Sequence, residues 1–318
     1  MKKNVIILFL ICLITSVYTQ TTIKDISFEN YPRVDGSTST FLLNRAIACK
    51  LLHIDSVTLS QYYDKFRTIA ARQKSSVPFM NGRIQASPTH QAFINLIENK
   101  TDIILTTRKM SENEKKYADS LGIKLIETPI ALDALIFLAN ENRGVKSLTS
   151  QQIQDIYMGK ISRWETIGGD SAILYPYIRN VNTGSQELLE NLVMKGLKKS
   201  WDDYIVMEYV SRSARSSMND IFKMITSENQ YAIYFTVHDH VEMLTRDQCP
   251  NVQMLTINGI EPNRKTITDR TYPYVAELYA VIRSDLPKND LTYKLYEWIQ
   301  SKDGQEAIKE SGYITITN

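Results

Sequence analysis

The sequence predicts an α/β protein with two domains, and three observations support this expectation. The chain has 318 residues, which is long enough for two hydrophobic cores. Short apolar runs rich in β-branched residues alternate with longer amphipathic segments, as is typical where helices cover a sheet. The composition is that of an ordinary globular protein, with 43% hydrophobic and 23% charged residues, and we find no internal repeat or low-complexity segment.

The charge balance and the N-terminus narrow the class of protein. With 37 basic and 35 acidic residues, the net charge of +2 creates no global field that would attract nucleic acid. Two lysines precede a short apolar run at 5–14, and small residues follow it, which predicts a cleaved signal peptide at 1–19. The bulky Ile11 before Cys12 argues against a lipoprotein signal. We therefore expect a periplasmic or secreted chain with no membrane insertion after cleavage.

In the first half of the chain, the spacing of apolar residues predicts helices and strands in turn. The expected elements are a helix at 41–52, a helix beginning near Thr89, a strand at 102–105, a helix at 112–121 and strands within 124–140. The last of these stretches is apolar over most of its length, so we expect it to pass through the interior of the molecule.

The second half begins with a capping pattern, because Thr149 or Ser150 precedes glutamines in a helix that ends near Gly159. The later elements are helices at 185–195 and 217–226, a strand at 230–237, a strand at 274–282 and one long last helix at 291–310. A hydrophilic, turn-rich segment at 258–271 separates the last two strands.

Three of the expected helices begin directly after loops rich in glycine or hydroxyl residues. These loops are GSTST at 36–40, SPTH at 87–90 and NTGSQ at 182–186. A helix N-terminus has unpaired backbone N–H groups and a partial positive charge, so it favours a bound anion. Small polar residues also cap ordinary helices, which leaves each loop ambiguous by itself. Arg179, four residues ahead of Thr183, adds a permanent charge beside the third loop.

Several segments spread over most of the chain carry a pattern shared with a known family. They are RVDGSTSTFLLNRAIA (33–48), TDIILTTRKMSENE (101–114), PIALDALIFLANENRGVKSLTSQQIQDIYMGKISRWETIGG (129–169), IRNVNTGSQE (178–187), AIYF (232–235), YPYVAELYAVI (272–282) and SKDGQEAIKESGYITI (301–316). In these segments the chain resembles the phosphate-binding proteins of ABC transporters, which have a type II periplasmic-binding-protein fold.

The resemblance implies two α/β lobes, each a mixed sheet flanked by helices, joined by crossing hinge strands that close the lobes around a ligand. Lobe I is expected at 20–130 and 256–318, and lobe II at 131–255. The implied function is capture of an inorganic oxyanion, with phosphate favoured, by a monomeric exported protein that serves an ABC permease complex. The resemblance implies neither an enzyme nor a cofactor or metal.

The resemblance also implies ligand donors at matching positions. Those of lobe I are Ser37, Thr38, Ser87, Thr89, Thr107 and Arg108, and those of lobe II are Arg179, Thr183, Gly184 and Ser185. The guanidinium of Arg179 would present a planar fork to two oxygens of the anion, and Gly184 would let the backbone approach it closely.

One position departs from the family pattern. Phosphate-specific members often carry an aspartate after the first lobe's strand, where it accepts the proton of a hydrogen phosphate. This chain has Thr106, Thr107 and Arg108 there. Arg108 either adds charge to the anion site or is structural and points away from it. Asp35 either replaces the missing acceptor or caps its own turn.

Two other functions stay open from the residues alone. A phosphate-ester hydrolase would need a serine nucleophile with His90, His238 or His240 as its base, but the chain has no G-x-S-x-G or H-E-x-x-H pattern. A secreted sensor or adhesion protein of the same fold would use the same binding chemistry. The two cysteines beyond the expected signal peptide, Cys49 and Cys249, either form a disulfide or remain two free thiols.

Overall fold

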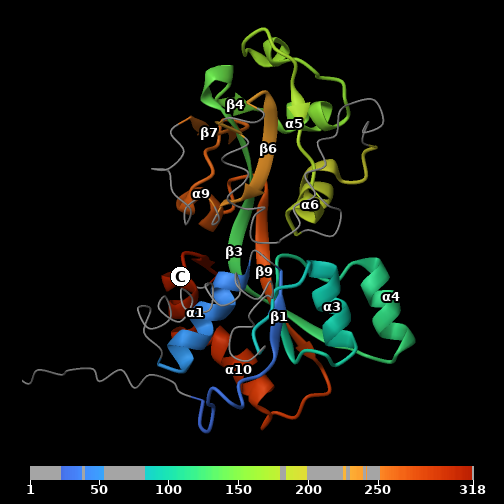
Figure 1. Cartoon of the computed structure of the whole chain (residues 1–318), viewed down its shortest axis with the longest axis vertical. Coiled ribbons are helices and arrows are strands. Elements are labelled where there is room, and N and C mark those ends of the chain that lie inside the picture. The colour runs from blue at the N-terminus through green and yellow to red at the C-terminus, as the bar shows by residue number, and fades with distance from the viewer. Residues whose placement is uncertain are drawn as a thin grey trace, which may run out of the picture.

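The structure is a computed structural model that describes residues 23–37, 40–53, 83–179, 184–198, 225–226, 230–238, 241 and 251–316. These residues form two lobes, one above the other along the long axis of the molecule (Figure 1). Helices lie against the strands in both lobes, which confirms the expected α/β class. Most of the expected helix at 217–226 lies outside the described residues.

Two long strands join the lobes. Strand β3 (Leu125–Asn140) is continuous over 16 residues and is buried from Ile130 onward. Its first part pairs antiparallel with β9 (Val275–Arg283), and its last part pairs with β6 (Ala232–Val237) and β7 (Val252–Met254). Figure 1 shows β3 and β9 running side by side from one lobe to the other. The apolar stretch therefore passes through the interior as one crossing strand.

The lower lobe in Figure 1 is lobe I, and its strands follow the order β1-β2-β9-β3. Strand β1 (Val34–Gly36) lies parallel to β2 (Ile103–Thr106), β2 is antiparallel to β9, and β10 (Ile314–Thr315) pairs with β3. Its helices are α1 (Phe41–Leu51), α3 (Thr89–Ile97), α4 (Glu112–Ser120), α10 (Leu291–Gln300) and α11 (Lys302–Glu310).

The upper lobe is lobe II. There β5 (Tyr175–Pro176) lies parallel to β6, and β4 (Ser147–Leu148) lies parallel to β8 (Thr256–Ile257). Its helical segments are η3 (Glu141–Arg143), α5 (Ser150–Tyr157), η4 (Trp164–Ile167), α6 (Gly184–Leu188), the π-helix η5 (Leu189–Met194) and α9 (Arg264–Thr268).

Side-chain caps decide where two of these helices begin. The hydroxyl of Thr149 accepts a hydrogen bond from the backbone N–H of Gln152 at 3.0 Å, and the side chain of Gln152 accepts one from the backbone N–H of Thr149 at 2.8 Å. This capping box makes Thr149, rather than Ser150, the N-cap of α5. A capping box at Asn263 likewise starts α9 within the segment that the sequence predicted as turns.

The expected single helix at 291–310 is wrong, because the chain forms α10 and α11 instead. Ser301 has an extended backbone, with φ −69° and ψ 169°, and its hydroxyl accepts a hydrogen bond from the N–H of Gly304. An extended residue ends the first helix, and the same residue caps the second. The break lets α10 and α11 pack on lobe I as separate helices, and both contribute to its core.

The two main apolar cores follow the two lobes. The core of lobe I is built on α1, β2 and the C-terminal helices, and that of lobe II on β3, β6 and α5. Residues Ile257, Ile267, Tyr272 and Ala276 belong to the core of lobe II, and Leu278 to that of lobe I. We therefore propose that the chain returns to lobe I between Ala276 and Leu278, rather than at residue 256.

The thiol of Cys49 is free and buried in lobe I, where burial raises its pKa to about 11. Cys249 lies outside the described residues. Within the described ranges, no helix has the length and apolar character needed to cross a bilayer.

Candidate functional site

The first loop of the expected site lies where two parallel strands end. Strands β1 and β2 are in register from Val34 to Gly36, so Ser37 and Thr107 leave the same edge of the sheet. The backbone N–H of Ser37 donates to the carbonyl oxygen of Leu105 at 3.1 Å. A Cβ on Gly36 would lie only 2.2 Å from that carbonyl oxygen, so glycine is required for this close approach.

Asp35 holds the first loop against the start of α3. One oxygen of its buried carboxylate accepts from the N–H of Gly36 at 2.8 Å. The other accepts from the hydroxyl of Ser87 at 2.9 Å and from the side-chain amide of Asn95 at 2.8 Å. The carboxylate thus links β1 to α3 through Asn95 and to the loop before α3 through Ser87. The proton of the Ser87 hydroxyl is directed at Asp35, although the sequence led us to expect it at the ligand.

Three hydroxyl groups of lobe I converge on Gly184 of lobe II. A Cβ on Gly184 would lie 2.7 Å from Thr107 Oγ1, 3.2 Å from Thr89 Oγ1 and 3.3 Å from Ser37 Oγ. Ser37, Thr89 and Thr107 are at most 2% exposed. Four of the expected site residues, from three separate segments of lobe I and one of lobe II, therefore meet at one buried point.

Two of these hydroxyls have no hydrogen-bond partner among the described residues. They are Thr89 Oγ1, at the first position of α3, and Thr107 Oγ1, just after β2. An unsatisfied buried hydroxyl costs about 1–3 kcal/mol, and native proteins have few of them. The hydrogen-bonding capacity of these two hydroxyls is therefore not used by any described residue.

Arg179 supplies the positive charge on the side of lobe II. Its Nη1 donates to the hydroxyl of Ser185 at 2.8 Å, and its backbone N–H donates to the side-chain oxygen of Gln186 at 2.8 Å. Desolvation on burial lowers the pKa of Arg179, which means that burial disfavours its charged form. An anion beside this guanidinium would offset that cost. Arg179 and Ser185 are thus joined as the expected loop requires.

Arg108 lies at the edge of the site but faces two carboxylates. Its Nη1 and Nη2 donate to Glu114 at 2.7 and 2.8 Å, and its Nε and Nη2 donate to Glu187 of α6. Nη1 also donates to the carbonyl oxygen of Lys109 at 2.8 Å. A guanidinium has five N–H donors, and these bonds occupy all five. The structure therefore favours the structural alternative for Arg108 over direct contact with an anion.

Three partners in this region were not found from the sequence. Asn95 and Glu187 gave no signal, because neither lies in a pattern that names its distant partner. Glu114 did have a sequence signal, because Ser111 and Glu114 have the spacing of a capping box, and α4 begins with this capping box. Two expected donors, Thr38 and Thr183, lie outside the described residues.

Of the histidines considered as bases, the structure describes His90 and His238. Nδ1 of His90 lies 2.9 Å from Glu114, and His238 is buried at the end of β6. His240 lies outside the described residues. Among the described residues, no group of three His, Cys, Asp or Glu side chains is placed to bind a metal ion.

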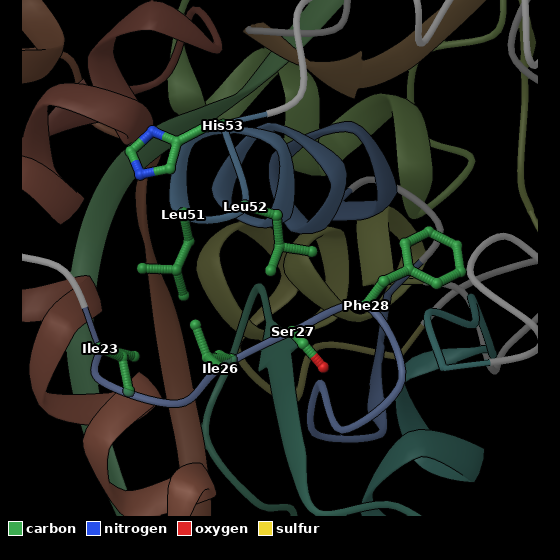
Figure 2. Close-up of a pocket in the computed structure, with 7 residues that line it drawn as sticks. All are labelled: Ile23, Ile26, Ser27, Phe28, Leu51, Leu52 and His53. Atoms are coloured by element: carbon green, nitrogen blue, oxygen red, sulfur yellow. The ribbon is translucent and has the colours of Figure 1, made fainter.

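A separate hollow of about 370 Å³ lies at the far end of α1 (Figure 2). Figure 2 shows its mainly aliphatic lining, with His53 at the rim; the residues are Ile23, Ile26, Ser27, Phe28, Leu51, Leu52 and His53. Eleven residues of helix separate it from the first loop, which is about 16 Å at 1.5 Å per residue. Its described lining residues include no arginine or lysine, and the hollow is not part of the candidate site.

Comparison with known proteins places these observations in a family. A family model described as the PBP superfamily domain matches residues 46–303. A phosphate-binding protein PstS from Staphylococcus epidermidis is 23% identical over 265 residues, which cover 81% of this chain and 76% of the relative. One from Staphylococcus aureus is 24% identical over 264 residues, with 81% and 76% covered.

Two solved structures show the same fold. A Clostridium perfringens protein with bound phosphate has a TM-score of 0.64 at 20% identity, over 91% of this chain and 100% of its own. An ABC-type phosphate transport receptor from Vibrio cholerae has a TM-score of 0.62 at 20% identity, over 89% and 98%. The expected two-lobed fold of periplasmic binding proteins is confirmed.

Proposed function

Because the chain belongs to the PBP superfamily, we propose that it binds an inorganic oxyanion, phosphate by preference, in the cleft between its two lobes. The protein releases this ligand to an ABC permease complex and performs no chemistry on it. We further propose that it is exported, with a signal peptide at 1–19, and acts as a monomer in the periplasm or outside the cell. The names of its relatives support the ligand and the transporter class.

The observation that carries the proposal is the set of hydroxyls around Gly184. Ser37, Thr89 and Thr107 approach that glycine from lobe I, and two of the three hydroxyls have no partner among the described residues. A phosphate offers four oxygens, each of which can accept hydrogen bonds, so it would satisfy such donors. Because the hydroxyls are buried, the bonds would form in a medium of low polarity, where they are strong.

The charge needed to neutralise the anion comes from Arg179. Its guanidinium is already held by Ser185, so little side-chain freedom remains to be lost when the anion binds. The proposed ligand donors are therefore Ser37, Thr89, Thr107, Arg179 and Ser185, with the backbone N–H of Gly184. Thr38 and Thr183 remain proposed donors from their place in the family pattern.

Two expected donors take supporting roles in this proposal. The hydroxyl of Ser87 and the carboxylate of Asp35 bind each other and fix the first loop. Arg108 is paired with Glu114 and Glu187. Neither Asp35 nor Glu114 is then the acceptor that would read the proton of a hydrogen phosphate. We propose that hydroxyl groups, which can donate or accept, take over that contact.

The test is calorimetric titration of the mature chain with phosphate, sulfate, molybdate and tungstate across a range of pH. We expect saturable one-site binding, tightest for phosphate. Arg179→Ala should remove most of the affinity, because it deletes the buried cation beside the anion. Arg163→Ala, which removes an exposed guanidinium paired with Glu165 within lobe II, is the matched control and should bind as the wild type does.

Two results would contradict the proposal. One is the absence of binding to any of the four oxyanions by protein that is folded by circular dichroism. The other is unchanged phosphate affinity in Arg179→Ala, which would show that the anion binds elsewhere. Steady turnover of p-nitrophenyl phosphate by the wild type would instead favour the hydrolase that the sequence left open.

A further inference from the structure

We propose that Arg108 and Glu187 form a charged latch between the lobes, which keeps the ligand bound without touching it. This inference rests on the proposed function, since it concerns how the same cleft holds its anion. Arg108 follows β2 in lobe I, and Glu187 lies in α6 of lobe II. Figure 1 shows α6 at the base of the upper lobe, above α3 of the lower lobe.

The contact between the two side chains is extensive. Arg108 donates to both oxygens of Glu187, from Nε to Oε2 and from Nη2 to Oε1, the latter at 2.8 Å. The residues are 79 positions apart in the sequence. A guanidinium and a carboxylate that share two hydrogen bonds have a defined relative orientation. The pair therefore fixes the distance and the angle between the lobes as well as joining them.

Lobe I alone holds Arg108 in the orientation that the latch needs. Glu114 receives two further bonds from the same guanidinium, and its side chain is fully buried. The guanidinium carbon lies 5.2 Å from the centre of the Phe93 ring, which supports its face. These contacts lie within lobe I and persist when the lobes separate. Only the bonds to Glu187 form and break as the cleft closes and opens.

Burial makes this pair stronger than an ordinary surface ion pair. The side chain of Arg108 is 8% exposed and that of Glu187 is 18% exposed. Charges in such a position are weakly screened by water and salt, whereas a fully exposed pair contributes little. When the lobes open, Glu187 would regain water while Arg108 keeps Glu114 as its partner. The closed form thus gains an attraction that the open form lacks.

The latch adjoins the anion site in the sequence of both lobes. Arg108 directly follows Thr107, and Glu187 lies three residues after Gly184 within one helix. Thr107 Oγ1 is the atom nearest to a Cβ built on Gly184, so these two residues also approach each other between the lobes. Formation of the latch therefore brings the two halves of the anion site together. Arg108 and Glu187 are positioning residues, and their effect should fall on ligand release rather than on ligand capture.

The experiment compares the rates of phosphate binding and release in Glu187→Gln with those of the wild type, by stopped-flow fluorescence. Glutamine keeps the size of the side chain and removes its charge. We expect the dissociation rate to rise by about tenfold or more and the association rate to change less than threefold. Glu165→Gln is the matched control, because it removes a carboxylate from an exposed pair with Arg163 elsewhere in lobe II.

A double-mutant cycle separates the latch from a general loss of charge. In Arg108→Gln/Glu187→Gln the dissociation rate should be close to that of the single variants, because the second change removes a partner already lost. If Arg108→Gln fails to fold, since it leaves Glu114 buried without its partner, Arg108→Lys serves instead, because lysine keeps a charge for Glu114 but cannot make the two-point contact with Glu187. Its dissociation rate should exceed that of the wild type, and adding Glu187→Gln should then raise the rate less than it does in the wild type.

A dissociation rate in Glu187→Gln equal to that of the wild type would overturn the latch while leaving the proposed function intact. If the wild type itself binds no phosphate, the proposed function fails and the latch is tested in the ligand-free chain. There, small-angle scattering should give a larger radius of gyration for Glu187→Gln than for the wild type, and equal radii would overturn the latch.

Discussion

Replacement of Gly184 by alanine tests the contact between the lobes most directly. The structure shows no left-handed backbone at Gly184, so alanine fits its conformation at the start of α6. Its methyl group, however, would lie 2.7 Å from Thr107 Oγ1, 3.2 Å from Thr89 Oγ1 and 3.3 Å from Ser37 Oγ. The substitution therefore places one methyl group between three hydroxyls and keeps the lobes from closing fully.

The expected loss of phosphate affinity follows from the size of the clash. A contact of 2.7 Å requires a shift of several tenths of an ångström, either of Thr107 or of the whole lobe. Overpacking by one methyl group in a well-packed interior costs about 1–3 kcal/mol. Because each 1.4 kcal/mol is tenfold in affinity, we expect the dissociation constant for phosphate to rise by about 5- to 150-fold.

The stability of the ligand-free chain should not fall with this substitution. It can relieve the clash by opening, and alanine restricts the unfolded chain more than glycine does. The free energy of unfolding should therefore stay unchanged or rise by about 0.4–1 kcal/mol. Calorimetric titration measures the first effect, and urea unfolding without ligand measures the second. Gly184→Val should weaken binding further, since it adds two more carbons at the same place.

This reasoning is refuted if Gly184→Ala binds phosphate as tightly as the wild type does. Such a result would mean that the bound form keeps the lobes farther apart than the structure shows. A loss of affinity together with an equal loss of stability would also contradict it, because the methyl group would then disrupt lobe II itself.

Three further predictions concern neighbouring side chains. Thr107→Val removes a buried hydroxyl without a partner among the described residues, so unfolding experiments should show equal or greater stability. Titration should show phosphate binding about 10- to 150-fold weaker, because a hydrogen bond to a charged group is lost. Burial alone would raise the pKa of Glu114, but hydrogen bonds and charge from Arg108 lower it. This carboxylate therefore stabilises the fold above about pH 4.3, and the stabilisation is lost as the pH falls through the lowered pKa. Glu114→Gln should therefore cost about 3 kcal/mol at pH 7, and urea unfolding should show that the difference from the wild type shrinks in acid. Asp35→Asn disturbs three hydrogen bonds and should destabilise the chain by about 1–3 kcal/mol, with an unchanged ratio of phosphate to sulfate affinity in titration. A changed ratio would show that Asp35 reads the proton of the ligand.

Local patterns in the sequence were sufficient for most of the helices and strands. The starts of α1, α3 and α4 and the cap of α5 follow from residues within a few positions of each other. The same holds for β3, whose long apolar run has no alternative to an interior position. The division of the last helix at Ser301 was missed, although serine is a residue type favoured at an N-cap.

The partners of Arg108 and Asp35 could not be found in this way. A guanidinium after a strand has the same local sequence whether it meets an anion or a carboxylate. Its choice depends on Glu187, which is 79 residues away in the other lobe. Asp35 likewise depends on Asn95, 60 residues further along the chain. A pattern of nearby residues cannot reveal a contact at either of these sequence separations.

The sequence by itself determined the α/β class, the crossing strand and the loops in which anion donors would lie, because periodicity and capping act over a few residues. Only the tertiary structure decided which of those donors lie close together. Ser37, Thr89 and Thr107 meet Gly184 because parallel strands end at one edge and the two lobes close over it. The same closure brings Arg108 to Glu187, so its guanidinium forms an ion pair between the lobes. Hydrogen bonds and charges act through space, so their partners are assigned only when the chain is folded.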